Sequence, residues 1–451
     1  MVGGGVSGLA TAFFLKQKGI RCTLLEKSSR LGGLIRTDVV EGCQLEAGPD
    51  SYIASKPAVT ELAAQLGLSA EIIESNDTER RVYIVRENRF IEMPRGMAMM
   101  VPGDLNTALK SPLFSSATKL RFFSEIFFLR RYRTGDFSVQ ELVNDHFGPE
   151  ILEYVTEPLL SGVYGGDSAR LSAESVLPRF VNYERQYGSL IRGVRHERRS
   201  PSQGGSLFLS FRGGMQELTD TLTADIADSV DVVHQEATAV KPFADGWRVV
   251  CGAQQFTGTH LVIAAPARIA AILLGNSAPA IAAELSAIPY SSAILITLVY
   301  RKADASIPEG FGFLVPRTER QTIAATTFIG TKWKSRIPPD LVALRAFVVD
   351  PEAPGMLGLS DDELVQRVRA DFRRLLHLMT KPIFSSVTRW PDSMPQYVVG
   401  HSEWMNRLND ILAGIPGLYL AGNSYSGVGV PDCVRLAEET AAKIAAQSAI
   451  N

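Results

Sequence analysis

The first eight residues constrain the fold of this chain more than any other stretch. Residues 3–8 form a G-x-G-x-x-G pattern, and the apolar segment 9–15 that follows has helical character. The chain then turns at Gly19 and runs through the apolar segment 20–25 to Glu26. A glycine turn, a helix, a strand and a terminal acid in this order predict a βαβ unit that binds a dinucleotide.

Each part of this pattern has a physical role. Gly3 permits the tight turn, Gly5 lets the backbone approach a pyrophosphate, and Gly8 lets the helix pack closely on the strand. The unpaired N–H groups at the start of the helix would face the phosphate anions. Glu26 lies where a carboxylate accepts both hydroxyl hydrogens of a ribose. A glycine-rich structural turn is the alternative, and the spacing of the other parts favours the dinucleotide site.

The strand before the glycines is short, because only Met1 and Val2 precede them. The central strand of a parallel sheet is normally a continuous apolar run. Either the sequence starts inside this strand, or the innermost strand of the sheet is unusually short. We favour a truncated start.

Composition is typical of a globular protein, and 451 residues are enough for two or three domains. Apolar residues make up 45% and charged residues 21%, and the net charge of −2 carries no sign of nucleic-acid binding. The sequence has no recognisable signal peptide. It also has no apolar run near the roughly 18 residues that a membrane-spanning helix needs.

Cysteines and histidines are scattered in patterns that do not match metal sites. The four cysteines lack C-x-x-C spacing, and the six histidines never lie four residues apart. We therefore expect no metal, and reduced, buried thiols in a cytoplasmic protein. The cysteines are Cys22, Cys43, Cys251 and Cys433.

The middle of the chain, from about Gly96 to Ser200, is predicted to form short helices. Segment 119–131 is amphipathic with cationic flanks, a pattern that suits a helix lying in the headgroup region of a membrane. An ordinary core-facing helix with a solvated basic edge fits the same pattern, and it is the interpretation that we prefer. Segment 195–205 is polar and rich in glycine, so we expect a linker there.

A second sheet is predicted between about residues 285 and 396, interrupted by one helix. Ser360 and Glu363 form a capping box at the start of that helix. The runs with β character are 293–300, 312–315, 322–328 and 341–349.

The C-terminal part repeats the arrangement of the N-terminal part. A strand at 417–421 ends in a glycine turn at Gly422 and Asn423, and a second turn at 427–431 leads into the last helix, where Pro431 suits the first turn. Two such ends on one sheet favour a large dinucleotide such as FAD. The residues by themselves indicate a flavoprotein and name no substrate.

Several segments resemble the porphyrinogen oxidases of heme biosynthesis, in the same order and over nearly the whole chain. They are 46–51, 157–167, 390–391, 394–397, 400–401 and 420–433. The resemblance implies an α/β fold of the amine-oxidase type, with a Rossmann-like FAD-binding domain, a mixed-sheet substrate domain and a helical, often membrane-facing insertion. We place the FAD-binding domain at 1–54, 207–285 and 397–451, the substrate domain at 55–95 and 286–396, and the helical domain at 96–206.

The same resemblance implies a reaction. The family oxidises protoporphyrinogen or coproporphyrinogen to the porphyrin by repeated hydride transfer from a meso carbon to flavin N5. Dioxygen reoxidises the flavin and yields hydrogen peroxide. The cofactor does the redox chemistry, so we assign no catalytic acid or base. The expected partners are a porphyrinogen and dioxygen. A homodimer and peripheral contact with the inner face of the cell membrane remain open.

Matching motifs give the residues expected around FAD. Those near the N-terminus should line the adenosine and pyrophosphate, and Arg36 can reach a phosphate. Segments 48–51 and 428–430 should approach the flavin, with Trp390 near the isoalloxazine unless it is a core residue. Ala237 stands where the family usually has a valine. The full set is Gly3, Gly4, Gly5, Val6, Ser7, Gly8, Glu26, Lys27, Gly32, Gly33, Leu34, Arg36, Gly48, Pro49, Asp50, Ser51, Ala237, Trp390, Gly422, Asn423, Val428, Gly429 and Val430.

A tetrapyrrole with propionates needs apolar walls and a cation. Arg81 resembles the propionate-binding arginine of the family, because a guanidinium can hold a carboxylate in bidentate fashion. Trp333 and Leu314 are candidates for the walls, and Gly166 for close backbone approach to the macrocycle. A surface role for the arginine and core roles for the two apolar residues are the alternatives.

Two other functions remain open from the sequence. An amine oxidase or a carotenoid-type desaturase would share the fold, although no paired tyrosines are evident and Cys433 lies beyond the glycine turn. A protein that binds flavin or traffics heme without turnover is the non-enzymatic alternative.

Overall fold

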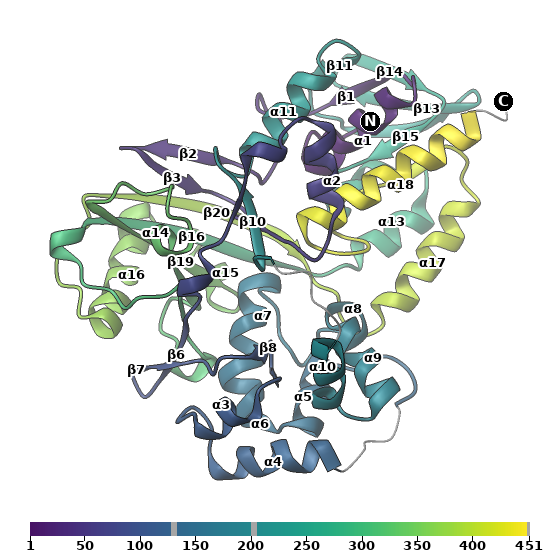
Figure 1. The fold of residues 1–451 in the computed structure, drawn as a ribbon. Coiled ribbons are helices and arrows are strands. Elements are labelled where there is room, and N and C mark those ends of the chain that lie inside the picture. Colours follow the sequence, from purple (N-terminus) through teal and green to yellow (C-terminus); the bar gives the residue numbers. More distant parts are fainter. Residues whose placement is uncertain (128–132, 200–204, 449–451) are drawn as a thin grey trace. The chain divides into compact units, whose positions relative to one another are not determined.

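The computed structural model describes residues 1–127, 133–199 and 205–448, and its chain divides into two compact units. Both units combine segments that lie far apart in the sequence (Figure 1). The first comprises Met1–Ser75, Ser206–Pro289 and Glu403–Asn451, and the second comprises Asn76–Gly205 and Tyr290–Ser402.

A parallel sheet forms the centre of the first unit. Two strand pairs, β1 with β11 and β15 with β21, are joined through Val2, which makes parallel bridges with Leu25 and Ile263. The predicted glycine turn, helix and strand are confirmed, since α1 follows the turn and leads into β1. The elements are α1 (Val6–Gln17), β1 (Cys22–Leu25), β11 (Val230–Val233), β15 (Leu261–Ile263) and β21 (Leu418–Leu420).

Two further helices, α11 (Gln216–Ile226) and α18 (Val430–Ser448), pack against α1. Figure 1 shows α1 and α18 side by side. α1 is apolar on nearly all sides, and its buried residues from Ser7 to Leu15 share one core with residues of α18 and the sheet. A helix that is apolar all round must be buried, so α1 fixes the glycine turn in the middle of the unit.

The remaining elements of the first unit surround this sheet. A three-stranded antiparallel sheet is formed by β12 (Ala239–Phe243), β13 (Gly246–Cys251) and β14 (Gln254–Gly258). Another contains β4 (Tyr52–Ile53), β10 (Phe208–Phe211) and β5 (Ile72–Glu74), and β2 (Thr37–Val40) pairs with β3 (Cys43–Glu46). The other helices are α2 (Ala58–Gln65), α12 (Ala267–Leu274), α13 (Pro279–Ser286) and α17 (His401–Ala413), which belongs to this unit from Glu403.

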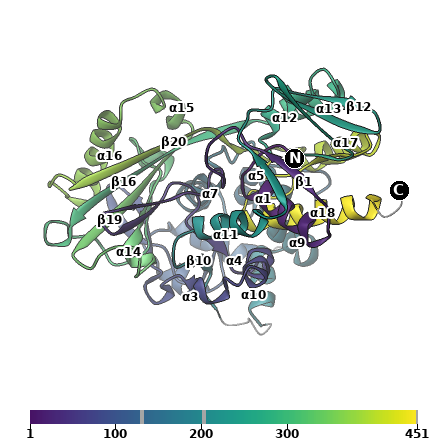
Figure 2. The same cartoon turned by 90° about the horizontal axis from the view of Figure 1, so that it is seen from above.

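The second unit contains the predicted second sheet, which has seven strands in the order β20-β16-β19-β18-β17-β6-β7. All four predicted β runs lie in it. Seen from above, α16 (Asp361–Leu376) covers one face of this sheet (Figure 2). The strands are β6 (Val82–Arg86), β7 (Arg89–Glu92), β16 (Tyr290–Arg301), β17 (Gly312–Leu314), β18 (Ala325–Phe328), β19 (Leu341–Val349) and β20 (Phe384–Pro395).

The predicted capping box of α16 is confirmed. The Glu363 backbone N–H donates to Ser360 Oγ, and the Ser360 backbone N–H donates to Glu363 Oε2 at 2.8 Å. Leu364, Val368 and Phe372 then lie on the buried face and pack on the sheet. The short helices α14 (Ile329–Lys332) and α15 (Glu352–Met356) complete this part.

The helical part of the second unit is organised around a buried polar cluster. His146 Nδ1 lies 3.0 Å from Glu125 Oε1, and its Nε2 lies 3.1 Å from Glu184 Oε1. The elements here are β8 (Met97–Ala98), β9 (Val101–Pro102), α3 (Leu105–Lys110), α4 (Ser116–Phe127), α5 (Val139–His146), α6 (Pro149–Ile151), α7 (Glu157–Tyr164), α8 (Ala173–Val176), α9 (Pro178–Tyr187) and α10 (Leu190–Arg199).

The linker predicted at 195–205 is wrong over its first half, because residues 195–199 belong to α10. Leu190, Ile191 and Val194 are buried and anchor one face of this helix, so its polar residues occupy the exposed face. Residues 200–204 lie outside the described residues. The amphipathic segment predicted at 119–131 forms α4 up to Phe127, and its remaining residues, 128–131, lie outside the described residues.

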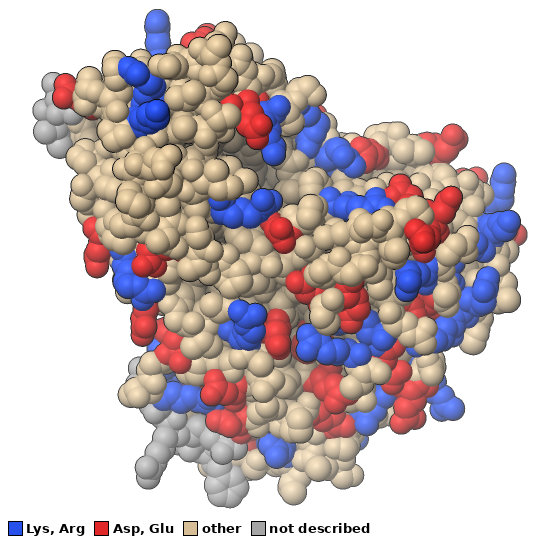
Figure 3. All heavy atoms as spheres, turned by 180° about the vertical axis from the view of Figure 1, so that it is seen from behind, with Lys and Arg blue, Asp and Glu red and all other residues tan. Residues whose placement is uncertain are grey.

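All four cysteines are free thiols; Cys43, Cys251 and Cys433 are buried, as predicted, whereas Cys22 is half-buried. Over the described ranges, every helix is too short or too polar to cross a bilayer. The same ranges bring together no group of three His, Cys, Asp or Glu side chains that could hold a metal ion. On the face drawn in Figure 3, basic and acidic side chains are interspersed.

Candidate functional site

The glycine turn at the start of the chain is held by the sheet on both sides. The Val2 N–H donates to the Val262 carbonyl at 2.9 Å, and the Gly3 N–H donates to the Leu25 carbonyl at 2.8 Å. Gly3 has φ +104°, and a Cβ added there would lie 2.6 Å from the Ala264 carbonyl oxygen. Both the conformation and the packing therefore require glycine at this position.

Gly8 lies in the first turn of α1, and its role in close packing is visible. A Cβ added at Gly8 would overlap the carbonyl oxygen of Gly3. Gly5, the N-cap residue, differs, since an added Cβ would meet only Gly33 Cα at 4.0 Å. Packing therefore leaves space in front of Gly5, which suits the approach of a pyrophosphate.

The start of α1 has no side-chain cap among the described residues and no acidic residue in its first turn. Its first N–H groups are available to an anion, and the helix dipole favours negative charge there. Loop 32–34 lies beside this helix start, because the Gly32 N–H donates to the Gly4 carbonyl at 2.8 Å. A Cβ on Gly33 would lie 3.1 Å from Gly5 Cα.

Glu26 holds the glycine turn directly. Its Oε2 accepts a hydrogen bond from the Gly4 N–H at 2.7 Å, and its Oε1 accepts from the Ser28 N–H at 2.9 Å. Ser28 Oγ also donates to Oε1 at 2.8 Å. An ionised carboxylate offers about four acceptor sites, so about one remains for a ribose hydroxyl unless Ser28 turns away. The ribose role of Glu26 stays a prediction, and the structure adds a role in fixing the turn.

Arg30 is a residue that the sequence analysis missed. Its guanidinium donates to three carbonyls of the loop that follows. The distance is 2.8 Å to the Leu31 oxygen and 2.9 Å to the Ile35 oxygen, and the third acceptor is the Gly33 carbonyl. Arg30 therefore holds loop 31–35 in shape. Burial is the main cause that lowers the pKa of Arg30, and the nearby cation Arg36 adds to it. The position of Arg30 just before the glycine doublet 32–33 is the feature of the sequence that could have identified it.

The predicted phosphate ligand Arg36 is in an ion pair. Its Nη2 lies 3.1 Å from Asp38 Oδ2, at the start of β2. Lys27 is exposed on the loop after β1, and Leu34 is exposed in the loop next to Gly33. The assignment of all three to the cofactor stays a prediction.

Segment 48–51 lies against the same loop. The Ala47 N–H donates to the Arg36 carbonyl at 2.8 Å, and a Cβ on Gly48 would overlap the Leu34 carbonyl oxygen. Ser210 of β10 donates through Oγ to the Asp50 carbonyl at 2.9 Å. The segment predicted at the flavin end is therefore packed beside the segment predicted at the pyrophosphate.

The C-terminal turn is organised by Asp432, a second residue that the sequence analysis missed. Lys56 Nζ lies 2.7 Å from Asp432 Oδ2, and the Gly429 N–H donates to the same oxygen at 3.3 Å. Gly427 has φ +124°, and a Cβ there would overlap the Asp432 carboxyl group. The position of Asp432 in the first turn of the last helix, where an acid is favoured by the helix dipole, is the feature of the sequence that could have identified it.

The turns at the two ends of the chain meet where α1 and α18 start. The Ser7 side chain hydrogen-bonds the Cys433 thiol, which connects the first turns of the two helices. Burial raises the pKa of Cys433 to about 11, so this thiol is unreactive near neutral pH. The structure thus brings together residues 3–8, 32–34, 48–51 and 427–430 in the first unit.

Ala237 lies in the first unit between β11 and β12, half-buried. It lies three residues after His234, whose Nδ1 is 2.7 Å from the Ser28 carbonyl oxygen next to Glu26. Trp390 belongs to the second unit, where it lies on β20 opposite Ala293 of β16. Its relation to the flavin stays a prediction.

The four residues predicted at the substrate also belong to the second unit. Arg81 Nη2 lies 2.6 Å from Glu79 Oε2 and 2.5 Å from Glu309 Oε2, and these hydrogen bonds raise its pKa. Leu314 lies on β17, next to β6, which starts just after Arg81. Trp333 is only 1% exposed and lies under Arg336 in a cation–π contact.

Gly166 follows α7 and has a packing role of its own. A Cβ added there would overlap Oε1 of Gln396, and the amide of that side chain donates to the Tyr164 carbonyl at 2.6 Å. The group that approaches Gly166 closely in the structure is thus the Gln396 side chain. Its approach to a macrocycle stays a prediction.

The fold and the glycine cradle define an α/β protein with a dinucleotide-binding βαβ unit. A family model described as flavin containing amine oxidoreductase matches residues 6–445. The chain belongs to this family, and FAD is its cofactor. The residues present fit that group, because they leave an uncapped helix start, open space at Gly5 and an acid at the end of β1.

Relatives cover the chain from end to end. It is 30% identical to a coproporphyrinogen III oxidase of Bacillus subtilis, with 96% of this chain and 95% of the relative covered. It is 28% identical to the chloroplastic protoporphyrinogen oxidase 1 of Arabidopsis thaliana, with 98% of this chain and 87% of the relative covered. These matches confirm the resemblance to the porphyrinogen oxidases.

Solved structures confirm the predicted fold. A protein of Exiguobacterium sp. 255-15, provisionally named a protoporphyrinogen oxidase, matches with a TM-score of 0.87 at 29% identity, covering 99% of this chain and 98% of that chain. A putrescine oxidase matches with a TM-score of 0.71 at 17% identity, and the match covers 99% of this chain and 98% of that chain. At this identity the second match shows the fold alone.

Proposed function

We propose that this protein is an FAD-dependent porphyrinogen oxidase of heme biosynthesis. The observation that carries the proposal is the similarity over 96–100% of the chain to relatives named as coproporphyrinogen III oxidases. The glycine cradle in the first unit supports it, because the reaction depends on a bound flavin. FAD, when bound, accepts hydride equivalents from the substrate and passes electrons to dioxygen.

The chain's own residues then have the tasks of binding and placement. The N–H groups at the start of α1 would hold the pyrophosphate, and Glu26 would accept hydrogen bonds from the ribose while it fixes Gly4. Arg30 and Asp432 are positioning residues, since they hold the loop 31–35 and the turn 427–430 in shape. We assign no acid or base to the reaction. The first unit binds the cofactor, and the second supplies the substrate-binding residues.

Arg81 is the proposed partner of a propionate. Its guanidinium pairs with Glu79 and Glu309, and 28% of its side chain and 77% of the Glu309 side chain are exposed. A substrate carboxylate can replace an exposed partner of this kind at low cost, because exposed ion pairs contribute little stability. Replacement of Arg81 by alanine should therefore raise KM about tenfold or more and leave FAD affinity unchanged, since a charge-assisted hydrogen bond contributes about 1.5–3 kcal/mol.

The deciding experiment is anaerobic reduction of the flavin, followed by its absorbance, with protoporphyrinogen IX and coproporphyrinogen III in separate mixtures. Fast bleaching by one of them, with porphyrin fluorescence after oxygen is added, establishes the reaction and the substrate. If both leave the bound flavin oxidised, the proposal fails. Amines and long-chain polyenes are then tested, because the amine oxidase and desaturase alternatives share the fold. A yellow protein that none of these reduces fits the non-enzymatic alternative.

We also propose peripheral membrane contact through α4. The helix has a buried face with Phe122 and Glu125, as expected of a core-facing helix. It has a second apolar face as well, with Leu120, Phe123 and Phe127 exposed by 69%, 45% and 70%. Residues at i, i+3 and i+7 lie on one side of a helix, and exposed apolar side chains there suit a lipid surface.

Cosedimentation with vesicles tests this contact and a location on the inner face of the cell membrane. Vesicles with anionic lipid should bind the protein, and the variant with Leu120→Ser and Phe127→Ser should stay in the supernatant. Equal recovery of both proteins in the supernatant would contradict membrane contact and leave a purely cytoplasmic location. Light scattering on the same preparation decides between monomer and homodimer.

A further inference from the structure

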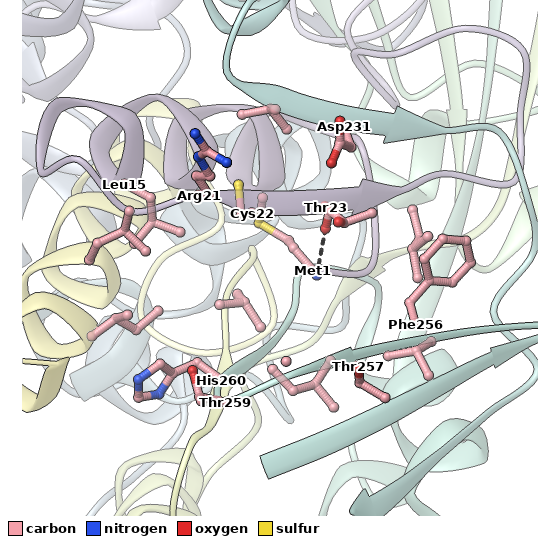
Figure 4. A pocket seen from close by; sticks show the side chains of 18 of the residues that line it. Met1, Leu15, Arg21, Cys22, Thr23, Asp231, Phe256, Thr257, Thr259 and His260 are labelled. Atoms are coloured by element: carbon pink, nitrogen blue, oxygen red, sulfur yellow. Dashed lines mark hydrogen bonds between the residues drawn. The ribbon is translucent and has the colours of Figure 1, made fainter. Parts of the chain in front are cut away.

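Figure 4 shows a cavity of about 640 Å³ beside Met1 in the first unit, lined by Cys22 and Thr23 of β1 and by His260. The Met1 nitrogen donates to the Thr23 carbonyl at 2.8 Å, so the chain's own first strand points into this space. We therefore assign the cavity no separate ligand. The seven-stranded sheet of the second unit offers a different site, on the face opposite α16.

The two faces of that sheet differ in how they are covered. Figure 2 shows α16 over one face, and Leu344, Ala346 and Val348 of β19 belong to the closed core beneath it. Side chains alternate between the two faces of a strand. Arg345 and Phe347 of β19 therefore lie on the opposite face of the sheet.

A polar row crosses this opposite face. Arg345 lies directly opposite Thr327 of β18 and Thr297 of β16, and Thr297 lies opposite Ser386 of β20. Cross-strand partners on one face lie about 4.5–5.5 Å apart, so these four side chains are neighbours. One guanidinium and three hydroxyl groups form the row, and all four can donate hydrogen bonds to an anion.

An apolar row runs beside the polar one, two residues further along each strand. Phe347 lies opposite Ala325 of β18 and Leu295 of β16, and Ala325 lies opposite Leu314 of β17. Leu314 is one of the two residues predicted at the walls of the substrate site. This face of the sheet is therefore amphipathic, with an apolar floor next to a row of donors.

Arg345 is positioned by the aromatic ring beside it. Its Cζ lies 4.9 Å from the centroid of the Phe347 ring, in a cation–π contact. Arg345 is only 3% exposed, whereas Phe347 and Thr327 next to it are half-buried. A guanidinium has five N–H donors in a planar fork, so it can hold a carboxylate in bidentate fashion while other donors bond protein groups. Removal from water strengthens such a bond.

We propose that Arg345 is a carboxylate-binding residue of the substrate site, with a role independent of Arg81. The inference rests on the proposed function, because the carboxylate is a propionate of the porphyrinogen. The macrocycle lies on the apolar row around Phe347, and its propionate edge lies on the polar row, where Arg345 and Thr297 donate to the carboxylate. Protoporphyrinogen and coproporphyrinogen share two neighbouring propionates, so Arg345 serves either substrate.

A guanidinium at this place distinguishes ligands by charge. A porphyrin whose propionates are methyl esters keeps the ring that fits the apolar row, but it has lost the anions. The protein should therefore prefer the free acid to the ester, and part of this preference should disappear without Arg345. A purely structural role of Arg345 would affect the acid and the ester alike.

The test measures the affinity of the FAD-loaded protein for coproporphyrin III and for its tetramethyl ester, by quenching of tryptophan fluorescence. In Arg345→Gln the Kd for coproporphyrin III should rise about tenfold or more, the expected effect of losing a hydrogen bond between charged groups. The Kd for the ester should stay nearly the same. In turnover assays KM should rise while kcat stays near the wild-type value, because Arg345 places the substrate and takes no part in hydride transfer.

Arg389→Gln is the matched control, because Arg389 lies in the same sheet on the other face. It is on β20 opposite Ile294, which belongs to the core under α16, and its guanidinium donates to Asp361 Oδ1 at 2.6 Å at the start of that helix. Its loss should leave both Kd values unchanged. If Arg345→Gln does not fold, Arg345→Lys decides. Lysine keeps the charge but cannot bind in bidentate fashion, so the Kd for the acid should rise by a smaller factor and that for the ester should not.

An equal change for the acid and the ester overturns the proposal, and so does an unchanged Kd for coproporphyrin III in the folded Arg345 variants. Binding is measured without turnover. Failure of both porphyrinogens to reduce the flavin would therefore refute the proposed reaction while this measurement still decides on the carboxylate site. Failure of the binding test leaves the reaction untouched.

Discussion

Glycines act in two distinct ways at the candidate cofactor site. At Gly3 and Gly8 the space of a side chain is occupied by protein backbone, so these residues are needed for the fold of the turn itself. At Gly5 that space is open, and only a ligand would be excluded from it. The same motif thus contains positions that shape the protein and a position that admits the cofactor.

This difference predicts opposite behaviour for two alanine variants. Gly5→Ala should lower FAD affinity more than tenfold while the stability of the cofactor-free protein changes by at most about 1 kcal/mol, because only the N-cap preference changes. Gly8→Ala should also lower the stability of the cofactor-free protein, by about 1–3 kcal/mol, since its methyl group overlaps backbone. Flavin fluorescence titration and denaturant unfolding measure the two effects. Equal losses of stability in both variants would contradict the distinction.

The buried histidine of the second unit makes a prediction about pH. Burial favours the neutral form of His146, but hydrogen bonds to Glu125 and Glu184 outweigh it, and its pKa is raised. Arg133 also faces this cluster, with Nε 3.3 Å from Glu184 Oε1. A raised pKa stabilises the folded state below the unfolded value of about 6.5, and this contribution is lost as pH rises through the folded value.

The variant His146→Gln should therefore lose most stability near pH 6, relative to the wild type, and the difference should shrink as pH rises through the raised pKa of His146 in the folded protein. The expected loss near pH 6 is about 1–3 kcal/mol, because each of two buried carboxylates loses one donor while Arg133 still faces Glu184 and Ser189 Oγ still donates to Glu125. Melting temperatures at several pH values measure it. His377→Asn is the control, since His377 is an exposed C-cap residue in the left-handed conformation that asparagine tolerates. A difference independent of pH would contradict the assignment.

At the scale of elements, α5 depends on a capping box that the sequence analysis did not single out. The Glu141 N–H donates to Ser138 Oγ at 3.1 Å, and the Ser138 N–H donates to Glu141 Oε2 at 2.7 Å. The backbone and side-chain hydrogen bonds from Ser138 lower the pKa of Glu141. A lowered pKa stabilises the folded state above the unfolded value, so the cap weakens as pH falls through the acidic range.

Ser138→Ala should lower the stability of the protein by about 1 kcal/mol at pH 7, the usual cost of losing an N-cap side chain. The loss should become smaller at acidic pH, because protonation of Glu141 weakens the cap. Ser124→Ala, inside α4, is the matched control, because its hydroxyl donates to the Arg121 carbonyl of its own helix and alanine is the better helix former. Denaturant unfolding at both pH values measures the two variants, and equal effects would contradict the role of the cap.

Local patterns predicted those elements whose cause is local. The glycine turn with α1, and the cap at Ser360, each need only a few neighbouring residues, and both are confirmed. Segment 195–199 shows the limit, because its helix depends on the burial of Leu190 and Val194 among other helices. Asp432 was missed for the same reason, because its partner Lys56 is brought near only by the folded chain. Arg30 was missed for another reason: it bonds carbonyls within five residues, and a side chain that bonds backbone leaves no pattern among neighbouring side chains.

At the scale of the whole molecule, the elements of the cofactor cradle come from two distant parts of the chain. Residues 3–34 and 48–51 lie in the first segment of the first unit and the turn 427–430 lies in its last segment, and most of the second unit separates them in the sequence. A ligand that contacts all three segments connects the two ends of the chain. The spacing of each motif could be read from the sequence, but their mutual contact depends on the packing of α1 against α18.

Hydrogen–deuterium exchange with and without FAD tests this arrangement on the intact protein. At an FAD concentration 100 times its Kd, amides whose exchange requires opening of the cradle should be protected up to about 100-fold. Protection should appear together in residues 3–8, in 32–34 and in 427–430. The amides of β12 to β14 serve as the internal control, because they belong to the same unit and contribute no predicted ligand. Protection of only one of the three segments would contradict a shared site. Protection of the control strands to the same degree would indicate stabilisation of the whole unit in place of direct contact.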